Sequence, residues 1–337
     1  AGIEITEKMV RIQSPGQGLQ PNRLTDLVGR RLPVSKTQGD VFFPSDLEKP
    51  AATPRQYQFK QPFGLPVRYH DIKVFSKVSN LDLVEIHLSY KDLEVNLDDV
   101  LPERQSMGLV IHAPELFAGD HTLDLCTNDN DYREHSKNEL QRVIDISKDL
   151  RGRFQCQEPV LLVTNVGGFS EHRHLDREER VPLQQRLIES ISQLNTSGEV
   201  EIIPQTMPPF PWHFGGQRFH NLFVDTNFIR SFCTELNMRV CLDVSHSKLA
   251  CNHLHIPFRD FLDQILPFTA HLHLADAKDV DGEGLQIDDG EIDWVQLFHQ
   301  IQQHCPKASF IPEIWQGHKN GGEAAWLALE RLESAAA

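Results

Sequence analysis

His271-Leu272-His273-Leu274-Ala275-Asp276 is the stretch of sequence that decides the fold. Successive side chains of a β-strand point to opposite faces, so the two histidines face one way and the two leucines face the other. A second short run, Cys241-Leu242-Asp243-Val244-Ser245-His246, also passes from apolar residues into an acid and a histidine. Short strands that end in polar residues are typical of a parallel sheet whose strand ends carry a functional site.

Eight runs of this kind lie between residues 64 and 333. Apolar and β-branched residues predict strands at 65–69, 83–88, 108–112, 160–164, 200–204, 240–243, 270–274 and 309–313. Amphipathic stretches follow most of them and predict helices, most clearly at 133–150, 182–194, 227–236 and 294–304. Eight strand–helix units in about 270 residues match the size of a TIM barrel. We therefore expect an α/β fold, with a (β/α)8 TIM barrel over residues 64–333.

The composition excludes several classes of partner. The 337 residues include 33 Lys and Arg against 48 Asp and Glu, for a net charge of −15. A surface this acidic repels phosphate backbones, so we expect no nucleic-acid or anionic-membrane partner. No apolar run approaches the roughly 20 residues of a membrane span. The six cysteines are scattered, which is typical of reduced thiols in a cytoplasmic protein.

The predicted strand ends hold an unusual set of polar side chains. They are Glu85, His87, His112, Gln205, Asp243, His246, His271, His273 and Glu313. A barrel would bring Asp243, His271, His273 and Glu313 together from three neighbouring strands, and mixed oxygen and nitrogen donors suit Mn, Mg, Zn or Co. A single histidine among 17 is more often a structural residue, but four polar residues at the same strand ends favour a metal or polyol site.

Two loops near these strand ends are candidate substrate contacts. In the segment 208–219, Trp212 offers an aromatic face for a sugar ring, and Arg218 offers a charge for an acid or phosphate. The alternative is a rigid loop packed over the barrel mouth. In the segment 315–322, backbone amides at a helix start and the ammonium of Lys319 favour a phosphate or carboxylate. An ordinary glycine-rich turn explains that segment nearly as well.

The first fifty residues differ from the rest in charge. They hold seven basic and six acidic residues, against 26 and 42 in the remainder. Residues 49–63 look like a linker stiffened by Pro50 and Pro54. Before it, short alternating runs predict strands at 3–5, 9–12, 32–34 and 41–43 and a helix at 24–28. We expect a small β-rich unit over residues 1–48, which can bury little surface alone.

Three strings in this unit resemble, in order and spacing, the antifreeze-like (SAF) domain of sialic acid synthases. They are Gly2-Ile3-Glu4-Ile5-Thr6, Ser14-Pro15-Gly16-Gln17-Gly18-Leu19 and Asp26-Leu27-Val28-Gly29-Arg30. The resemblance implies a β-clip domain that follows a synthase barrel in a longer polypeptide. It is also compatible with a homodimer. In those synthases, an arginine before Pro-Gly-x-Gly reaches the acyl-mannosamine substrate of the other subunit. Ser14 takes that position here, so a docking domain without chemistry is the alternative.

The remaining chain resembles the xylose-isomerase-like TIM barrel superfamily, which includes sugar epimerases, inosose dehydratase and endonuclease IV. The strings that carry the resemblance are His112-Ala113-Pro114, Leu242-Asp243 followed by His246, His273-Leu274-Ala275-Asp276-Ala277-Lys278, Gly290-Glu291-Ile292-Asp293-Trp294 and Glu313. It implies that Asp243, His273 and Glu313 are metal ligands and that His246 binds the substrate. The places of His112 and His271 on the third and seventh predicted strands make them candidate substrate contacts.

One position departs from this family's pattern. Gln205 stands where the family has a glutamate in a Glu-Asn-x-Pro string. A glutamine carbonyl can coordinate a hard cation, but it brings no charge and accepts no proton. Glu313 is then the best base, and Glu85 is the only candidate for a second base. Strand four lacks the extra ligands of the tri-zinc repair site, and the net charge also excludes DNA repair.

Two functions of different class follow. The first is metal-assisted proton transfer on a sugar, by an isomerase, epimerase or dehydratase of nonulosonic acid or surface-polysaccharide synthesis. The second is a non-catalytic sugar-binding or scaffolding barrel attached to the synthase. Asp243, His246, His273 and Glu313 favour the first, whereas Gln205 and Ser14 favour the second.

Overall fold

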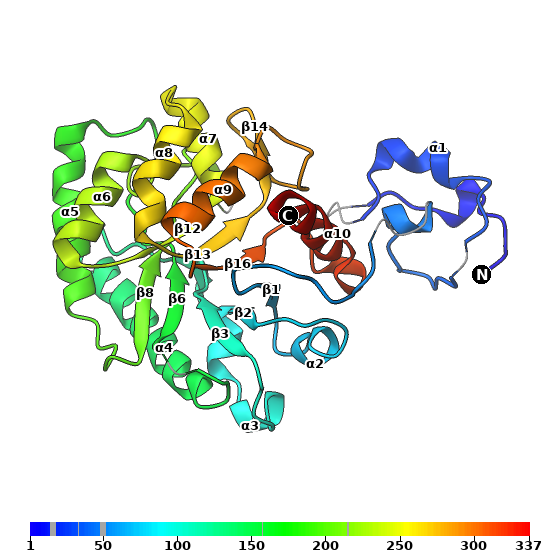
Figure 1. The fold of residues 1–337 in the computed structure, drawn as a ribbon, viewed down its shortest axis with the longest axis horizontal. Coiled ribbons are helices and arrows are strands. Elements are labelled where there is room, and N and C mark those ends of the chain that lie inside the picture. The colour runs from blue at the N-terminus through cyan, green and yellow to red at the C-terminus, as the bar shows by residue number, and fades with distance from the viewer. Residues whose placement is uncertain (14–17, 33, 48–51, 157, 214–215) are drawn as a thin grey trace.

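The computed structural model describes residues 1–13, 18–32, 34–47, 52–156, 158–213 and 216–337. Figure 1 shows a ring of strands with helices outside it, and the C-terminal helix α10, in red, next to the N-terminal segment in blue.

Eight parallel strands form the ring. Five of them pair in the order β1 (Gly64–Val67), β2 (Leu83–His87), β3 (Gly108–His112), β6 (Val160–Thr164) and β8 (Val200–Pro204). The other three pair in the order β12 (Val240–Asp243), β13 (Thr269–Leu274) and β16 (Ser309–Pro312). Parallel bridges from Gln205 to Cys241 and from Phe63 to Phe310 join the two sheets at both edges. The predicted α/β TIM barrel is therefore confirmed.

The helices of the barrel lie on its outer surface (Figure 1). They are α2 (Ile72–Phe75), α3 (Leu97–Val100), α4 (Asn130–Arg151), α5 (Arg177–Ser192), α6 (Thr226–Leu236), α7 (Val244–Leu254), α8 (Phe258–Ile265), α9 (Trp294–His304) and α10 (Lys319–Ala336). Aspartates begin five of them and accept backbone N–H groups of the first turn, namely Asp129, Asp176, Asp225, Asp243 and Asp293. This cap explains why α5 starts before the predicted position at Pro182, which lies inside the helix.

Short strands and 3-10 helices lie in the segments that connect the barrel strands and helices. They are β4 (Leu116–Phe117), β5 (His121–Thr122), β7 (Phe169–Ser170), β9 (Trp212–His213), β10 (Gly216–Gln217), β11 (Phe219–His220), β14 (Asp276–Lys278), β15 (Gly282–Leu285), η4 (Tyr90–Glu94) and η5 (Leu266–Phe268). The antiparallel pair β14–β15 bears directly on the site, because it follows β13 on the side where the strands end.

The barrel interior is filled in two parts. Apolar side chains from successive strands, including Val110, Val163, Ile203 and Ile311, form one buried cluster inside the ring. Polar side chains occupy the interior toward the ends of the strands, and Glu85 in the middle of β2 is fully buried. Buried charge must be paired, so this polar half of the interior is held by contacts between side chains rather than by apolar packing.

The N-terminal segment differs from its prediction. Its described residues form η1 (Glu7–Met9), η2 (Pro21–Arg23), α1 (Leu24–Leu27) and η3 (Pro44–Asp46), with one isolated bridge and no strand. The helix at 24–28 is confirmed, but strands at 3–5, 9–12 and 41–43 were wrong. The prediction at 32–34 includes a position outside the described residues.

Packing explains the missing strands. The apolar residues of this segment gather in a small cluster of Ile5, Leu27, Leu32 and Leu47. An alternating run becomes a strand only when a partner satisfies its backbone groups along its length. Here Ile5 pairs only through its N–H to Arg30 and its carbonyl to Gly29.

Two global properties follow from the described chain. Among the described residues, no helix combines the length and apolar character that crossing a bilayer requires. All six cysteines are free thiols, and only Cys156 is not buried.

Candidate metal centre

Three neighbouring strands bring the predicted ligands together. Asp243 at the end of β12 is in register with His273 of β13, and the N–H of Glu313, just beyond β16, donates to the carbonyl of Leu274. The ligand atoms of Asp243, His273 and Glu313 all lie within 4.8 Å of one another. His273 Nδ1 is 2.6 Å from Glu313 Oε2 and 3.8 Å from Asp243 Oδ2. Two carboxylates and one imidazole nitrogen are a donor set that fits a divalent cation.

The start of α7 orients Asp243. Its Oδ1 accepts the backbone N–H of His246 at 2.8 Å, as the N-cap of the helix. Its Oδ2 is thereby left facing His273 and Gln205. Burial raises the pKa of Asp243 to about 6, although the neighbouring His246 opposes the shift.

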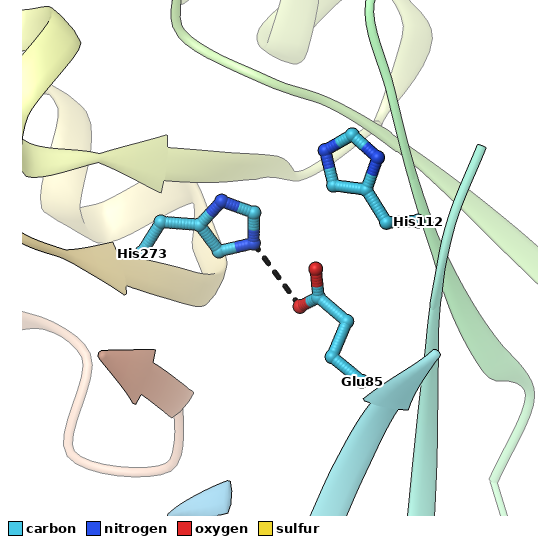
Figure 2. Close-up of side chains that lie close together, drawn as sticks. All are labelled: Glu85, His112 and His273. Atoms are coloured by element: carbon cyan, nitrogen blue, oxygen red, sulfur yellow. Dashed lines mark hydrogen bonds and ion pairs between the residues drawn. The ribbon is translucent and has the colours of Figure 1, made fainter. Parts of the chain in front are cut away.

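Glu85 lies behind His273 and orients it. Figure 2 shows the carboxylate of Glu85 pointing at the imidazole of His273 from β2, with the ring of His112 above that carboxylate in the view. Glu85 Oε2 is 3.0 Å from His273 Nε2, so the Nε2–H donates to it and the Nδ1 faces Asp243 and Glu313. A carboxylate behind a histidine is the usual means by which proteins fix the tautomer of a metal-binding imidazole.

Electrostatics couple the same groups. Burial alone would lower the pKa of His273, but Cys241, Glu313 and Glu85 outweigh it and hold the pKa well above the ordinary value. Burial, the largest single cause, would raise the pKa of Glu313 and of Glu85, but the charge and hydrogen bond of His273 together with the neighbouring histidines outweigh it and lower both. One imidazolium therefore compensates the surrounding carboxylates.

Gln205 also reaches this cluster. Its Nε2 donates to Asp243 Oδ2 at 3.1 Å and lies 3.1 Å from His273 Nδ1, while its Oε1 is 3.4 Å from His112 Nε2. His112 Nδ1 lies 2.8 Å from the carbonyl of Ala113 and donates to it, which leaves a lone pair on Nε2. If the Gln205 amide were rotated by 180°, its N–H would donate to the lone pair of His112 Nε2. Its carbonyl oxygen would then face Asp243 and His273. Gln205 therefore fits a fourth, neutral ligand.

His246 lies at the edge of the cluster. Its Nδ1 is 3.0 Å from the carbonyl of Thr206, and its Nε2 is 3.1 Å from Glu283 Oε1 in β15. Burial would lower the pKa of His246, but Asp243 and Glu283 outweigh it and raise the pKa to about 10. The side chain is thus a cationic hydrogen-bond donor beside the candidate ligands.

The histidines of β2 and β3 form a second layer. His87 stacks on His112 with ring centroids 4.7 Å apart, and His112 lies 5.7 Å from His273. Ligand atoms of Glu85, His112 and His273 also lie within 4.8 Å of one another. Burial lowers the pKa of His112, with His87 adding to the effect, so its imidazole is neutral.

Two predicted site residues are fully buried. Glu85 has no exposed surface, so the structure favours an orienting role over that of a second base. His271 is equally buried, with its Nδ1 2.7 Å from Ser309 Oγ and its Nε2 2.8 Å from Glu85 Oε2.

Of three further residues predicted to contact substrate, two lie away from the cluster and one has a side chain that the structure does not describe. Arg218 stacks over the ring of Phe169, 5.4 Å from its centroid. Lys319 lines a cleft beside the N-terminal segment. The side chain of Trp212 lies outside the described part of the chain.

Two residues near the site were not among the predicted site residues. His87, whose Nδ1 is 4.0 Å from Glu313 Oε1, is among the polar residues noted at the strand ends, but no role in the site was predicted for it. Glu283 carries no signal in the sequence, because only the β14–β15 pair brings it to His246.

Comparison with known proteins decides the family. Residues 78–334 match the family described as "Xylose isomerase-like TIM barrel". The chain belongs to this family. Residues 1–77 lie outside the match, so the resemblance of residues 1–48 to SAF domains stays a prediction. A search of curated protein sequences found no match.

Solved structures share the fold of this xylose isomerase-like barrel. A D-tagatose 3-epimerase-like protein is 17% identical with a TM-score of 0.56, over 82% of this chain and 100% of its own. An L-ribulose 3-epimerase is 13% identical with a TM-score of 0.55, over 81% and 95%. The 3-keto-D-glucoside 4-epimerase YcjR of E. coli is 12% identical with a TM-score of 0.55, over 81% and 99%. At these identities the likeness shows the fold alone.

Proposed function

We propose that this xylose isomerase-like barrel is a metal-dependent sugar isomerase, epimerase or dehydratase. The observation that carries the proposal is the convergence of Asp243, His273 and Glu313 at the strand ends, with Glu85 fixing the imidazole from behind. Asp243, His273 and Glu313 would hold the divalent ion, with Gln205 as the neutral fourth ligand. When bound, such an ion supplies a Lewis acid that polarises the carbonyl and hydroxyl oxygens of a sugar.

Glu313 is the group best placed to move a proton. Its side chain is 32% exposed, whereas that of Asp243 is 5% exposed. Its pKa is lowered by His273, so it is ionised at neutral pH and can accept a proton from the carbon beside a carbonyl. His246 is cationic between Asp243 and Glu283, and an oxygen of the same sugar would have to share or take over the Nε2–H that now donates to Glu283 Oε1.

The site supports proton transfer on one face of the sugar. Epimerisation through two faces needs two proton acceptors, but Gln205 cannot accept a proton and Glu85 has no exposed surface. A 1,2-isomerisation or a dehydration needs only one acceptor. We therefore favour these reactions over a two-base epimerisation.

The experiment is exchange of solvent deuterium into a bound sugar. D-fructose, D-tagatose, N-acetylmannosamine and inososes, incubated with protein and Mn²⁺ in heavy water, are expected to gain deuterium beside the carbonyl. Glu313→Gln removes the acceptor and is expected to abolish the exchange, while the exposed-site control Val295→Ala retains it. Binding of these sugars without exchange would instead support the second candidate, a sugar-binding barrel, which the uncharged Gln205 favours.

The pathway is a finer part of the proposal. The resemblance of residues 1–48 to SAF domains is the sole support for placing the sugar in nonulosonic acid or surface-polysaccharide synthesis. Activity on N-acylated hexosamines above that on simple ketoses, in the same exchange assay, would support this placement.

A further inference from the structure

A cleft of about 420 Å³ lies between the N-terminal segment and the rim of the barrel. Phe43 and Ser45 line it from the N-terminal segment, and Gln286, Trp315, Lys319 and Glu323 line it from the barrel. Volumes of this size are typical of sites for small molecules. The residues of the N-terminal wall lie outside the family match at 78–334, so this cleft is an addition to the family barrel.

Hydrogen bonds hold the two walls of the cleft together. Ser45 Oγ donates to Glu323 Oε2 at 2.8 Å and accepts from Asn320 Nδ2 at 2.9 Å. The N–H of Gly18 donates to Gln316 Oε1 at 3.3 Å. Gly18 has a φ of +70°, and a Cβ there would lie 2.2 Å from the carbonyl oxygen of Phe42, so a side chain at this position would disrupt the wall. The cleft is thus preformed.

The groups that face the cleft suit a sugar ring. Trp315 is 77% exposed, the most exposed large apolar side chain of the described barrel. Within the described parts of the chain, neither its indole N–H nor the ammonium of Lys319 has a hydrogen-bond or ion-pair partner. An aromatic face packs against the C–H face of a pyranose, while an amide, an ammonium and a carboxylate bond its hydroxyls. Lys319 and Glu323 bring opposite charges, so the cleft has no net preference for an anion.

Two segments connect this cleft to the metal centre. Trp315 follows Glu313 by two residues, and its N–H donates to the carbonyl of Gly284 at 2.9 Å. The β15 strand that holds Gly284 also carries Glu283, which contacts His246 at the centre, and Gln286 of the cleft follows it. The same two loops therefore form walls of both sites.

We propose that the cleft binds a glycosyl unit of the substrate, so that the enzyme acts on a sugar of disaccharide size or a glycoside. This inference rests on the proposed function, because that function places the reacting sugar unit at the metal centre. In it, the reacting unit lies at Glu313 while the attached unit packs against Trp315.

The test compares D-fructose with lactulose, in which a galactosyl unit is attached to fructose. Titration calorimetry with Mn²⁺ present is expected to show that lactulose binds at least about tenfold more tightly. Trp315→Ala is expected to remove this preference, and Trp315→Phe, which keeps an aromatic face, is expected to retain most of it. Val295→Ala, at another exposed apolar residue, is the control that leaves the preference unchanged. Trp315 is at the surface, and circular dichroism checks that each variant folds.

Four outcomes would overturn the inference. They are equal affinity for the two sugars, no binding of either, a preference that survives Trp315→Ala, and competition of inorganic phosphate with lactulose that Lys319→Ala abolishes. The last would make the cleft an anion site. Failure of the proposed function looks different, because the wild-type protein would then prefer lactulose yet exchange no deuterium into it or into D-fructose.

Discussion

Oε2 of Glu85 lies 3.0 Å from Nε2 of His273, across the interior of the barrel and 188 residues away in sequence. This contact leaves the other imidazole nitrogen, Nδ1, facing the carboxylates of Asp243 and Glu313. The buried carboxylate thus controls which nitrogen of His273 is offered to a cation, although it has no exposed surface itself.

Glu85→Gln is expected to weaken Mn²⁺ binding by about 10- to 100-fold, because the neutral amide no longer holds the Nε2 proton of His273 in place. Titration calorimetry measures the affinity, and thermal unfolding checks that the variant folds. The control is Glu235→Gln, which makes the same replacement of a carboxylate by an amide at an exposed position. An unchanged affinity in a folded Glu85→Gln variant would contradict the orienting role.

Gln205→Glu is expected to act in opposite directions with and without metal. A carboxylate at this position lies about 3 Å from Asp243, so like-charge repulsion lowers the Tm in the presence of a chelator. With Mn²⁺ the added charge tightens binding by about tenfold or more, and the Tm rises further than in the wild type. Differential scanning calorimetry with EDTA and with Mn²⁺ measures both effects. Weaker metal binding in the variant would show that residue 205 is not a ligand.

Metal affinity is expected to rise with pH. In the protein without metal, the carboxylates around His273 hold its pKa well above the ordinary value, and burial raises the pKa of Asp243 to about 6. Both groups must lose a proton to become ligands. For each proton released on binding, the metal affinity therefore rises about tenfold per pH unit. Calorimetry in buffers of different ionisation enthalpy counts the protons directly. An affinity that is the same at pH 5.5 and 8 would contradict the assignment.

His121 is expected to make the fold sensitive to acid. Burial, with a contribution from His135, lowers the pKa of His121 to about 4, below its ordinary 6.5. Between these values the unfolded chain binds a proton that the folded chain does not, so the free energy of unfolding falls as the pH falls from 6.5 toward 4. His121→Asn should flatten this part of the pH profile of Tm. An equal slope in the variant and the wild type would assign the acid sensitivity to other groups.

Local pattern was sufficient to predict the barrel. Alternating or continuous apolar runs are a property of a few neighbouring residues, and the eight predicted strands coincide with the observed ones to within two residues at each end. Because parallel strands place their carboxyl ends at one mouth, the positions of Asp243, His273 and Glu313 at those ends also predicted that they would meet.

The sequence pattern gave wrong predictions where a strand needs a neighbouring strand to pair with. The alternating runs of the N-terminal segment look like strands, yet no strand forms in its described residues, because the small cluster around Leu27 gives them no ladder of hydrogen bonds. Glu85 was the only candidate for a second base, and closure of the barrel, which the local pattern does not record, buries it against His273.

The sequence by itself determined the class of the fold, the strand ends and the chemistry available at them, since these depend on periodicity along the chain. Only the tertiary structure decided which acid orients His273, how Glu283 reaches His246, and that Ser45 and Glu323 together close a cleft beside Trp315. Each of these contacts joins residues far apart in sequence. Their distance is set by barrel closure and loop packing, and no local pattern records it.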